Sequence, residues 1–362
     1  MPALFVYEKD LVDPTPNIPS LDGKVIFVTG GTAGLGKSTI LALLAHRPSH
    51  IYFSGRSLPA AEALISSVTS STSTGGGGTA APPPLTFVQM DLTSLASVKS
   101  AVEKHFAHDR LDVLVNNAGI MASAAGLSAD GFEVQFATNH LGHAMLVRAL
   151  LPVLQRTAAL PGSDVRVVTL TSLGYQGHPK KGISFATLRT TQTGPPLLGQ
   201  WIRYGRPPSS KATVAVAAVA TTKEMYGDRM PTELTSPAAS RQSKLANILF
   251  ARELARRHPS ITSVVVHPGV VGTGLVTNQG LVNRALVYLP SKIMGAAVLT
   301  PEQGCWNQVW AAAAAKKADL VNGAFYMPVG TLADDLLDGC ARDDKLAAEL
   351  WRWTEEVLDG IH

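Results

Sequence analysis

Short runs of apolar and β-branched residues alternate along the chain with longer stretches of helical periodicity. Seven runs are hydrophobic almost without interruption, at 25–28, 51–53, 85–90, 113–115, 165–170, 264–266 and 324–327. Strands covered by helices on both faces show such continuous hydrophobicity, whereas half-exposed strands alternate with polar residues. The pattern therefore predicts an α/β fold: a single Rossmann-type doubly wound parallel sheet of about seven strands with helices on both faces.

Composition narrows the class of protein. The 362 residues are 46% hydrophobic and 16% charged with a net charge of +4, and no Lys/Arg cluster suggests a nucleic-acid partner. Cys305 and Cys340 lack metal-ligand spacing, so no metal site is expected. Charged residues at 8–10 occupy the place of a signal peptide's apolar core, which favours a cytoplasmic location. Polar residues interrupt 281–300, which is no transmembrane segment but leaves peripheral membrane contact as an alternative to ordinary packing.

A glycine-rich turn follows the first predicted strand and precedes a predicted helix. Its sequence from Thr29 to Gly36 reads Thr-Gly-Gly-Thr-Ala-Gly-Leu-Gly. Such a turn brings the backbone close to a pyrophosphate at the positive end of the helix. The residues expected to contact the cofactor here are Gly30, Thr32, Gly34, Leu35, Gly36 and Lys37. The run from Gly31 to Ser38 also fits the P-loop pattern, so a nucleotide triphosphatase with Asp91 as its Mg²⁺ ligand is the alternative.

The end of the second predicted strand bears on the choice of dinucleotide. It carries Arg56 and no carboxylate where a ribose-binding Asp or Glu is expected. A guanidinium there would bind a 2′-phosphate through bidentate hydrogen bonds, which favours NADP over NAD. The alternative is that Arg56 is an ordinary solvated surface charge.

Further motifs follow in order: Asp91-Leu92, Asn116-Asn117-Ala118-Gly119, a helix containing Asn139, and His267-Pro-Gly-Val-Val-Gly-Thr273. Together with the glycine turn they resemble the short-chain dehydrogenase/reductase family, in the branch similar to retinol dehydrogenases and fungal reductases, over about residues 20–355. The resemblance favours the dinucleotide-binding interpretation of the glycine turn over the P-loop. It implies that Asp91 and Leu92 contact adenine, that Asn117, Ala118 and Gly119 line the cofactor, and that Val271 and Thr273 contact the nicotinamide amide. It also implies that Asn139 holds a relay water and that Ser172 orients a substrate carbonyl.

The family's chemistry needs a Tyr and a Lys one helical turn apart. Lys244 lies in a matching segment, where the resemblance also places it against the cofactor, but the residue four positions earlier is Ser240. A serine hydroxyl is far less acidic than a phenol. Removing residues 206–241 joins Tyr204-Gly205 to Gln242-Ser243-Lys244 and restores Tyr-x-x-x-Lys. We therefore expect Tyr204 to correspond to the catalytic tyrosine and 206–241 to be an insertion that interrupts the catalytic helix.

Three interpretations of the insertion remain open at this point. In the first, it is a translated intron in an ordinary reductase. In the second, it is a real segment that loops out while Tyr204 returns to the site. In the third, it interrupts the catalytic pair in a protein that binds NADP and substrate but no longer reduces the substrate. Ser236 and Pro237 are favourable start signals for the helix that carries Lys244.

The resemblance, with Arg56 favouring NADP, thus implies an NADPH-dependent carbonyl/alcohol oxidoreductase with Ser172, Tyr204, Lys244 and Asn139 as catalytic residues. The apolar segment 275–310 is expected to cover the site, which favours a small lipophilic substrate. The resemblance implies a role in secondary metabolite biosynthesis, with a retinoid or steroid-like compound as second choice, and a possible homodimer whose interface would include the interrupted helix. The alternative is an NADP-binding protein of the same fold without reductase activity, acting as a cyclase, isomerase or scaffold.

Overall fold

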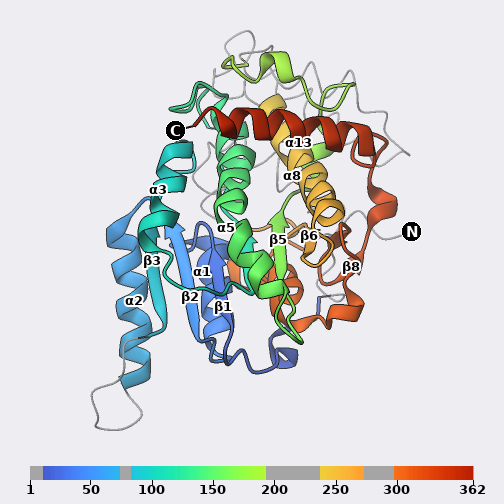
Figure 1. Ribbon diagram of the computed structural model, residues 1–362. Helices are drawn as coiled ribbons and strands as arrows, with labels where there is room; N and C mark the ends of the chain where they lie inside the picture. Colours follow the sequence, from blue (N-terminus) through green and yellow to red (C-terminus); the bar gives the residue numbers. More distant parts are fainter. Residues whose placement is uncertain (1–10, 74–82, 122, 193–236, 273–296, 362) are drawn as a thin grey trace, which may run out of the picture.

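An eight-stranded sheet forms the centre of the structure (Figure 1), a computed structural model that describes residues 11–73, 83–121, 123–192, 237–272 and 297–361. The strand order is β3-β2-β1-β4-β5-β6-β7-β8, and every neighbouring pair is parallel except β7 and β8. The strands are β1 (Val25–Val28), β2 (His50–Gly55), β3 (Leu85–Gln89), β4 (Val113–Asn116), β5 (Arg166–Leu170), β6 (Thr262–Val266), β7 (Phe325–Met327) and β8 (Thr331–Leu332).

The predicted doubly wound sheet is confirmed, with one strand more than expected. The extra strand, β8, is two residues long, and both are exposed. An exposed strand of this length leaves no hydrophobic run in the sequence, so periodicity could not reveal it.

Side chains of the central strands alternate between two hydrophobic clusters, one on each face of the sheet. In β1, Val25 and Phe27 join the first cluster, whereas Ile26 and Val28 join the second. This alternation follows from the two-residue period of a strand. Because both faces are covered, every residue of β1 is buried, which explains why the predicted strands read as continuous apolar runs.

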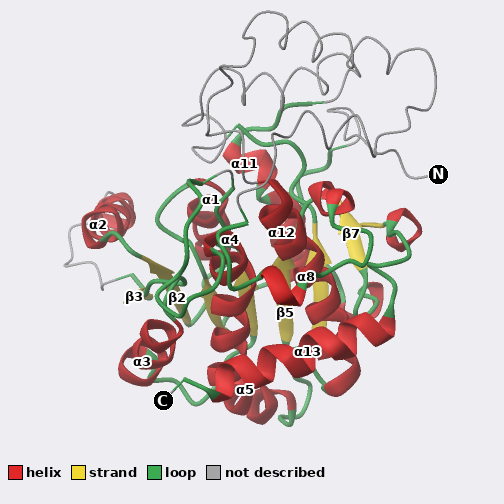
Figure 2. Cartoon of the chain, turned by 90° about the horizontal axis from the view of Figure 1, so that it is seen from above, coloured by secondary structure: helices red, strands yellow, loops and turns green. Residues whose placement is uncertain are grey.

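Helices form a layer on each face (Figure 2). The first cluster includes residues of α3, α5, α8 and α13, and the second includes residues of α1, α2, α12 and η7. The α-helices are α1 (Gly34–Leu44), α2 (Leu58–Ser73), α3 (Leu95–His105), α4 (Val134–Phe136), α5 (Gly142–Ala158), α8 (Pro237–Arg257), α11 (Pro301–Gly304), α12 (Trp306–Val309) and α13 (Asp344–Asp359). The 3-10 and π segments are η2 (Thr15–Asn17), η3 (Ala137–Leu141), η4 (Leu173–Gly177), η5 (Phe185–Thr187), η7 (Trp310–Ala314), η8 (Lys317–Asp319) and η9 (Asp334–Leu336).

The low-complexity loop expected over 66–84 is wrong in its first part, because α2 continues to Ser73. Serine and threonine hydroxyls in this stretch bond to the helix's own carbonyls, as Thr69 Oγ1 does to Ile65 (2.9 Å) and Ser70 Oγ does to Ser66 (2.9 Å). Side chains that are satisfied in this way do not compete with the helical backbone bonds. Residues 74–82 lie outside the described residues.

The helix start predicted from Ser236 and Pro237 agrees with the structure, whereas residues 206–236 of the expected insertion lie outside the described residues. Helix α8 begins at Pro237, so residues 237–241 form its first turn and lengthen the helix that carries Lys244. Proline suits this position because the first helical N–H has no partner within the helix. Residues 193–236, which include Tyr204, lie outside the described residues. Within the described parts of the chain, no helix is long and apolar enough to cross a membrane.

Helix α13 lies across α5 and α8 (Figure 1). Its Trp351 ring stacks on Phe250 of α8 with centroids 4.7 Å apart. At the end of α13, Arg148 of α5 pairs with Asp359 (2.5 Å). The outer surface of α8 is therefore partly covered by the chain's own last helix.

A buried carboxylate joins the starts of β1 and β4. Asp112 accepts hydrogen bonds from Val25 N (3.0 Å), Lys24 Nζ (3.1 Å) and both Nε and Nη2 of Arg110 (2.7 Å each). Burial alone would raise the pKa of Asp112, but the bonds from Arg110, Val25 and Lys24 outweigh it and lower the pKa. The charged carboxylate is thus the form that the fold stabilises.

Replacing Asp112 with alanine is expected to lower the free energy of unfolding by about 2–4 kcal/mol at pH 7, because Val25 N–H and two cations lose their acceptor. Since the folded pKa is lowered, this stability is fully present above the unfolded value near 4 and is lost as pH falls through the folded value. Urea denaturation at pH 7 and pH 3 measures both effects. As control, Asp22→Ala removes only exposed contacts, the ion pair with Arg47 and the hydrogen bond from Ser20 Oγ, and an exposed ion pair contributes about 1 kcal/mol or less. Equal losses in both variants would contradict the assignment.

Candidate functional site

The glycine turn has the predicted place, between β1 and α1. Gly30 and Gly34 have φ values of +66° and +52°, a backbone conformation that L residues with side chains rarely adopt. A Cβ atom on Gly31 would lie 2.5 Å from Ile40 Cδ1, and one on Gly36 would collide with the Gly30 carbonyl oxygen. The turn therefore exposes backbone rather than side chains next to the N-terminus of α1.

Thr29 fixes the start of this turn to β4 and α5. Its hydroxyl accepts hydrogen bonds from the backbone N–H groups of Asn117 and Ala118 (2.9 Å each) and lies 2.9 Å from His143 Nε2. Since His143 Nδ1 lies 3.0 Å from the Asn139 carbonyl, Nδ1–H is the donor there and Nε2 accepts the Thr29 proton. Burial lowers the pKa of His143 to about 4, so the ring is neutral near pH 7.

Asn117 braces the turn from the other side. Its Nδ2 donates to the Thr29 carbonyl (2.8 Å), and its Oδ1 accepts from Gln308 Nε2 (3.2 Å). Gln308 Nε2 also contacts Thr39 Oγ1 of α1. Neither Gln308 nor His143 belongs to a local sequence pattern that predicts contact with the turn, so their roles emerge only from the structure.

Three predicted residues converge next to β4. A Cβ atom built on Gly119 would lie 3.2 Å from Asn139 Oδ1 and 3.6 Å from Lys244 Nζ. Asn139 is held firmly: Oδ1 accepts from Ile120 N (2.8 Å), and Nδ2 donates to Ile120 O (3.0 Å) and Ser243 Oγ (3.0 Å). Asn139 lies in the π segment η3, and helix irregularities of this kind often occur at functional sites.

Lys244 lies on α8 beside the carboxyl end of β5. Its Nζ lies 3.5 Å from the Leu170 carbonyl, and its own carbonyl accepts from Thr171 Oγ1 (2.8 Å). Desolvation lowers the pKa of Lys244 to about 8, although the side chain is only half-buried. Ser172 follows Thr171 directly, is half-buried, and does not use its hydroxyl to cap η4. The structure thus brings Asn139 and Lys244 together, with Ser172 at the adjoining strand end.

The other predicted cofactor contacts lie around this centre. Thr32 lies against Gly55, so that the turn adjoins the end of β2, where Arg56 is exposed. Val271 is buried, and a Cβ on Gly304 would meet both Val271 (2.6 Å) and Leu35 (2.9 Å), so these two residues of distant segments pack together against α11.

Asp91 and Leu92 follow β3. Asp91 Oδ1 accepts from Thr93 N and Oγ1 (2.9 Å each), and Leu92 packs against Gly142 at the start of α5. Lys37 is exposed on α1. Tyr204 and Thr273 lie outside the described residues, so the contacts expected of them stay predictions.

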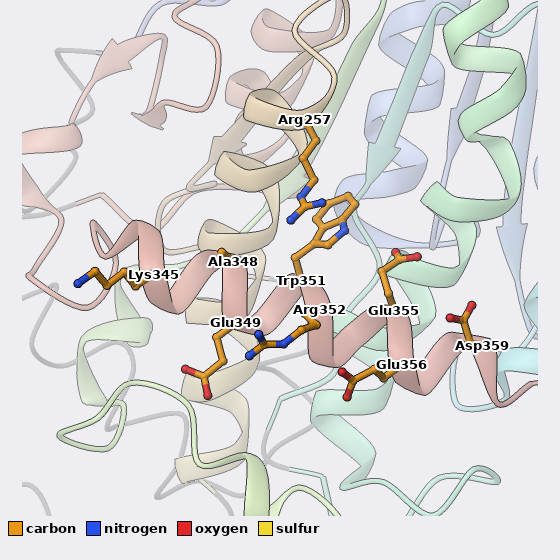
Figure 3. A pocket seen from close by; sticks show the side chains of 9 residues that line it. All are labelled: Arg257, Lys345, Ala348, Glu349, Trp351, Arg352, Glu355, Glu356 and Asp359. Atoms are coloured by element: carbon orange, nitrogen blue, oxygen red, sulfur yellow. The ribbon is translucent and has the colours of Figure 1, made fainter.

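A surface groove along the outer side of α13 contains none of these residues (Figure 3). Its lining is mostly charged and comprises Arg257, Lys345, Ala348, Glu349, Trp351, Arg352, Glu355, Glu356 and Asp359. Sites for small molecules are usually concave and mostly apolar with few polar groups. The groove is therefore a poorer candidate than the carboxyl edge of the sheet.

Comparison with known proteins agrees with the geometry. Residues 24–182 match the family model described as short chain dehydrogenase. A short-chain dehydrogenase/reductase from Aspergillus calidoustus is 34% identical over 354 residues, covering 94% of this chain and 95% of that protein. Polyprenol dehydrogenase from Mus musculus is 32% identical over 348 residues, with 93% and 84% covered. The crystal structure of an uncharacterized protein from Mycobacterium paratuberculosis has the same fold, with a TM-score of 0.62, 24% identity and coverage of 96% and 97%.

Proposed function

This chain belongs to the short-chain dehydrogenase/reductase family, and from that premise we propose that it is an NADPH-dependent oxidoreductase interconverting a carbonyl and an alcohol on a lipophilic small molecule. The observation that carries the proposal is the convergence of Lys244 Nζ and Asn139 Oδ1 beside Gly119. In open α/β sheets, ligands bind at the carboxyl ends of the strands, where these residues lie.

The residues at this edge fit a dinucleotide phosphate. The turn from Gly30 to Gly36 would hold the pyrophosphate, with Thr32, Leu35 and Lys37 around it, because backbone N–H groups at a helix N-terminus favour anions. Arg56 would bind the 2′-phosphate and Asp91 with Leu92 the adenine, while Asn117, Ala118, Gly119, Val271 and Thr273 would line the nicotinamide half. NADPH supplies the hydride when bound.

The chain's own residues would manage the proton and the carbonyl. Ser172 would donate a hydrogen bond to the substrate oxygen and polarise the carbon for attack. Tyr204 would transfer its phenolic proton to that oxygen as the alcohol forms. The Lys244 ammonium would lower the pKa of Tyr204, and Asn139 would hold the water that resupplies the proton.

The lipophilic substrate rests on the apolar segment 275–310 and on the match to a polyprenol dehydrogenase. A compound of secondary metabolism is our first choice, supported by the fungal relative, and a retinoid or steroid-like compound is the second. A homodimer is also proposed, on a surface other than the part of α8 that α13 covers. We also propose that residues 281–300 make peripheral contact with a membrane, where a lipophilic substrate would be found.

Purified full-length chain tests the function directly. We expect NADPH to bind and to be oxidised in the presence of at least one member of a panel of lipophilic ketones and aldehydes, followed by absorbance and product analysis. Binding of NADPH without oxidation across the panel would favour the second candidate, an NADP-binding protein that acts as a cyclase, isomerase or scaffold. The specific observation that favours this candidate is Ser240 in α8, one turn before Lys244.

Substituting Arg56 with alanine is expected to weaken NADPH binding about 10- to 100-fold and to leave NADH binding unchanged, because a charged hydrogen-bond pair with the 2′-phosphate is lost. Titration calorimetry with NADPH and with NADH measures both dissociation constants in the wild type and in the variant. Arg156→Ala, an exposed arginine near the C-terminal end of α5, is the matched control. An equal loss for NADH, or no loss for NADPH, would show that Arg56 does not read the 2′-phosphate.

A further inference from the structure

A second group of chemically active side chains lies apart from the cofactor edge. His178 follows η4, and Asp338 and Cys340 lie between η9 and α13. One ligand atom of each, an imidazole nitrogen, a carboxylate oxygen and the thiol sulfur, lies within 4.8 Å of the other two. Histidine and aspartate are 160 positions apart, which is why no spacing in the sequence predicted the group.

The orientation of His178 is set by its second nitrogen. Nδ1 lies 2.6 Å from the Pro179 carbonyl oxygen, which can only accept, so Nδ1 carries the proton. In the neutral ring, Nε2 then directs its lone pair at Asp338 Oδ2, 2.9 Å away. Two lone pairs at this distance repel, so a positive charge has to lie between them: a proton on Nε2 or a metal ion.

Metal-binding histidines commonly donate their other N–H to a carbonyl or carboxylate, which fixes the ring and its tautomer. The Pro179 contact has this form. The His178 side chain is only 9% exposed, whereas that of Asp338 is 36% exposed, so the ring is largely enclosed by protein and the Asp338 carboxylate, whose Oδ1 accepts from Ala341 N (3.0 Å), is accessible to an entering ion.

The backbone around the group is also held in place. Tyr175 of η4 donates its hydroxyl proton to the Leu336 carbonyl (3.1 Å) and accepts from Asp338 N (3.2 Å). Cys340 Sγ lies 3.8 Å from the Lys180 carbonyl, so its thiol faces the histidine's own segment. The three donors thus come from two segments that are already fastened together.

We propose that His178, Asp338 and Cys340 bind one borderline divalent cation of the Zn²⁺ type. Imidazole, carboxylate and thiolate are the ligands that zinc prefers, and a water completes the tetrahedron. Binding releases the Cys340 thiol proton, and the carboxylate and thiolate charges balance the ion. The ion would tie the end of η4, which begins directly after Ser172, to the segment between η9 and α13.

The test uses metal-stripped full-length chain titrated with Zn²⁺ and with Co²⁺ alone, without nucleotide or substrate, so its outcome is independent of the proposed reductase activity. We expect one ion per chain by calorimetry and a near-ultraviolet thiolate-to-cobalt charge-transfer band. Because the chain has two cysteines, the band is assignable: Cys340→Ser should abolish it and Cys305→Ser should retain it. Loss of a residue that only hydrogen-bonds a metal ligand lowers metal affinity about 10- to 100-fold. Because His178 is proposed as a ligand itself, His178→Gln should lower the affinity for Zn²⁺ by more than this.

Circular dichroism and thermal unfolding without metal verify that each variant folds. Absence of binding in folded wild-type chain overturns the proposal, as does a cobalt complex without the thiolate band or with unchanged affinity in Cys340→Ser. In the first case the group is an ion pair between His178 and Asp338, and in the other two the Cys340 thiol takes no part in binding the ion.

Discussion

Replacing Tyr204 with phenylalanine is expected to lower the rate of carbonyl reduction about 10²- to 10⁴-fold, because the substrate oxygen loses its proton donor. NADPH binding should change little, since the phenol ring is kept and only the hydroxyl is removed. Stopped-flow measurement of NADPH oxidation, together with a fluorescence titration of NADPH, separates the chemical step from binding.

The structure supplies a sharper companion to this variant. Ser240 lies in α8, one helical turn before Lys244, where the family places its tyrosine. The double variant with Tyr204→Phe and Ser240→Tyr should therefore regain most of the lost rate, because the phenol returns to the same helix face as the ammonium. Tyr204→Phe with Ser240→Phe is the matched control and should stay inactive.

The outcomes separate the interpretations of the insertion. If Tyr204→Phe reduces as fast as the wild type, Tyr204 is not the proton donor. If the wild type is inactive and Ser240→Tyr alone creates activity, the long chain has lost its donor, which supports the second candidate function. Sequencing the mature transcript across codons 200 to 245 decides whether residues 206–241 are translated.

Lys244→Met is expected to lower the turnover about 10²-fold or more, because the tyrosine loses the cation that favours its ionised form. The free energy of unfolding of Lys244→Met, in contrast, should stay the same or rise. Desolvation lowers the pKa of Lys244 to about 8, so burying its ammonium costs stability at neutral pH, and the methionine stem keeps the packing. The variant should unfold at the same or a higher urea concentration than the wild type at pH 7.

The pH dependence of stability should also differ between the wild type and Lys244→Met. Because the folded pKa of Lys244 lies below its ordinary 10.5, the wild type gains stability as pH rises from about 8 toward 10.5, and Lys244→Met lacks this gain. Turnover of the wild type should fall as pH rises above about 8, where the ammonium is lost. Lys345→Met on the exposed start of α13 is the control for removing a positive charge. Full turnover in Lys244→Met would remove Lys244 from the catalytic set.

The sequence predicted those parts of the site that form within one short segment. The glycine turn, the strand ends and the Lys244 helix each follow from local chemistry: positive-φ glycines, buried β-branched runs, and a proline at a helix start. The strand β8 and the helical part of 66–73 could not be predicted, because a two-residue exposed strand and a Ser/Thr-rich helix both lack a hydrophobic period.

The hydrogen bonds between residues far apart in the chain could not be predicted from the sequence either. Gln308 reaches Asn117 across 191 positions, and His143 reaches Thr29 across 114 positions. Such pairs depend on which strand ends meet at one edge of the sheet, and no spacing along the chain encodes that. The partners of Asp338 were hidden for the same reason.

The anchoring of Thr29 has a consequence for the order in which the protein acquires function during synthesis. The groups that hold Thr29 Oγ1 lie 88, 89 and 114 positions later in the chain. β1 likewise pairs on one side with β2 but on the other with the much later β4. A nascent chain that has emerged only as far as α3 therefore has its glycine turn but not the partners that fix it. We expect nucleotide affinity to arise only after β4 and the start of α5 have left the ribosome.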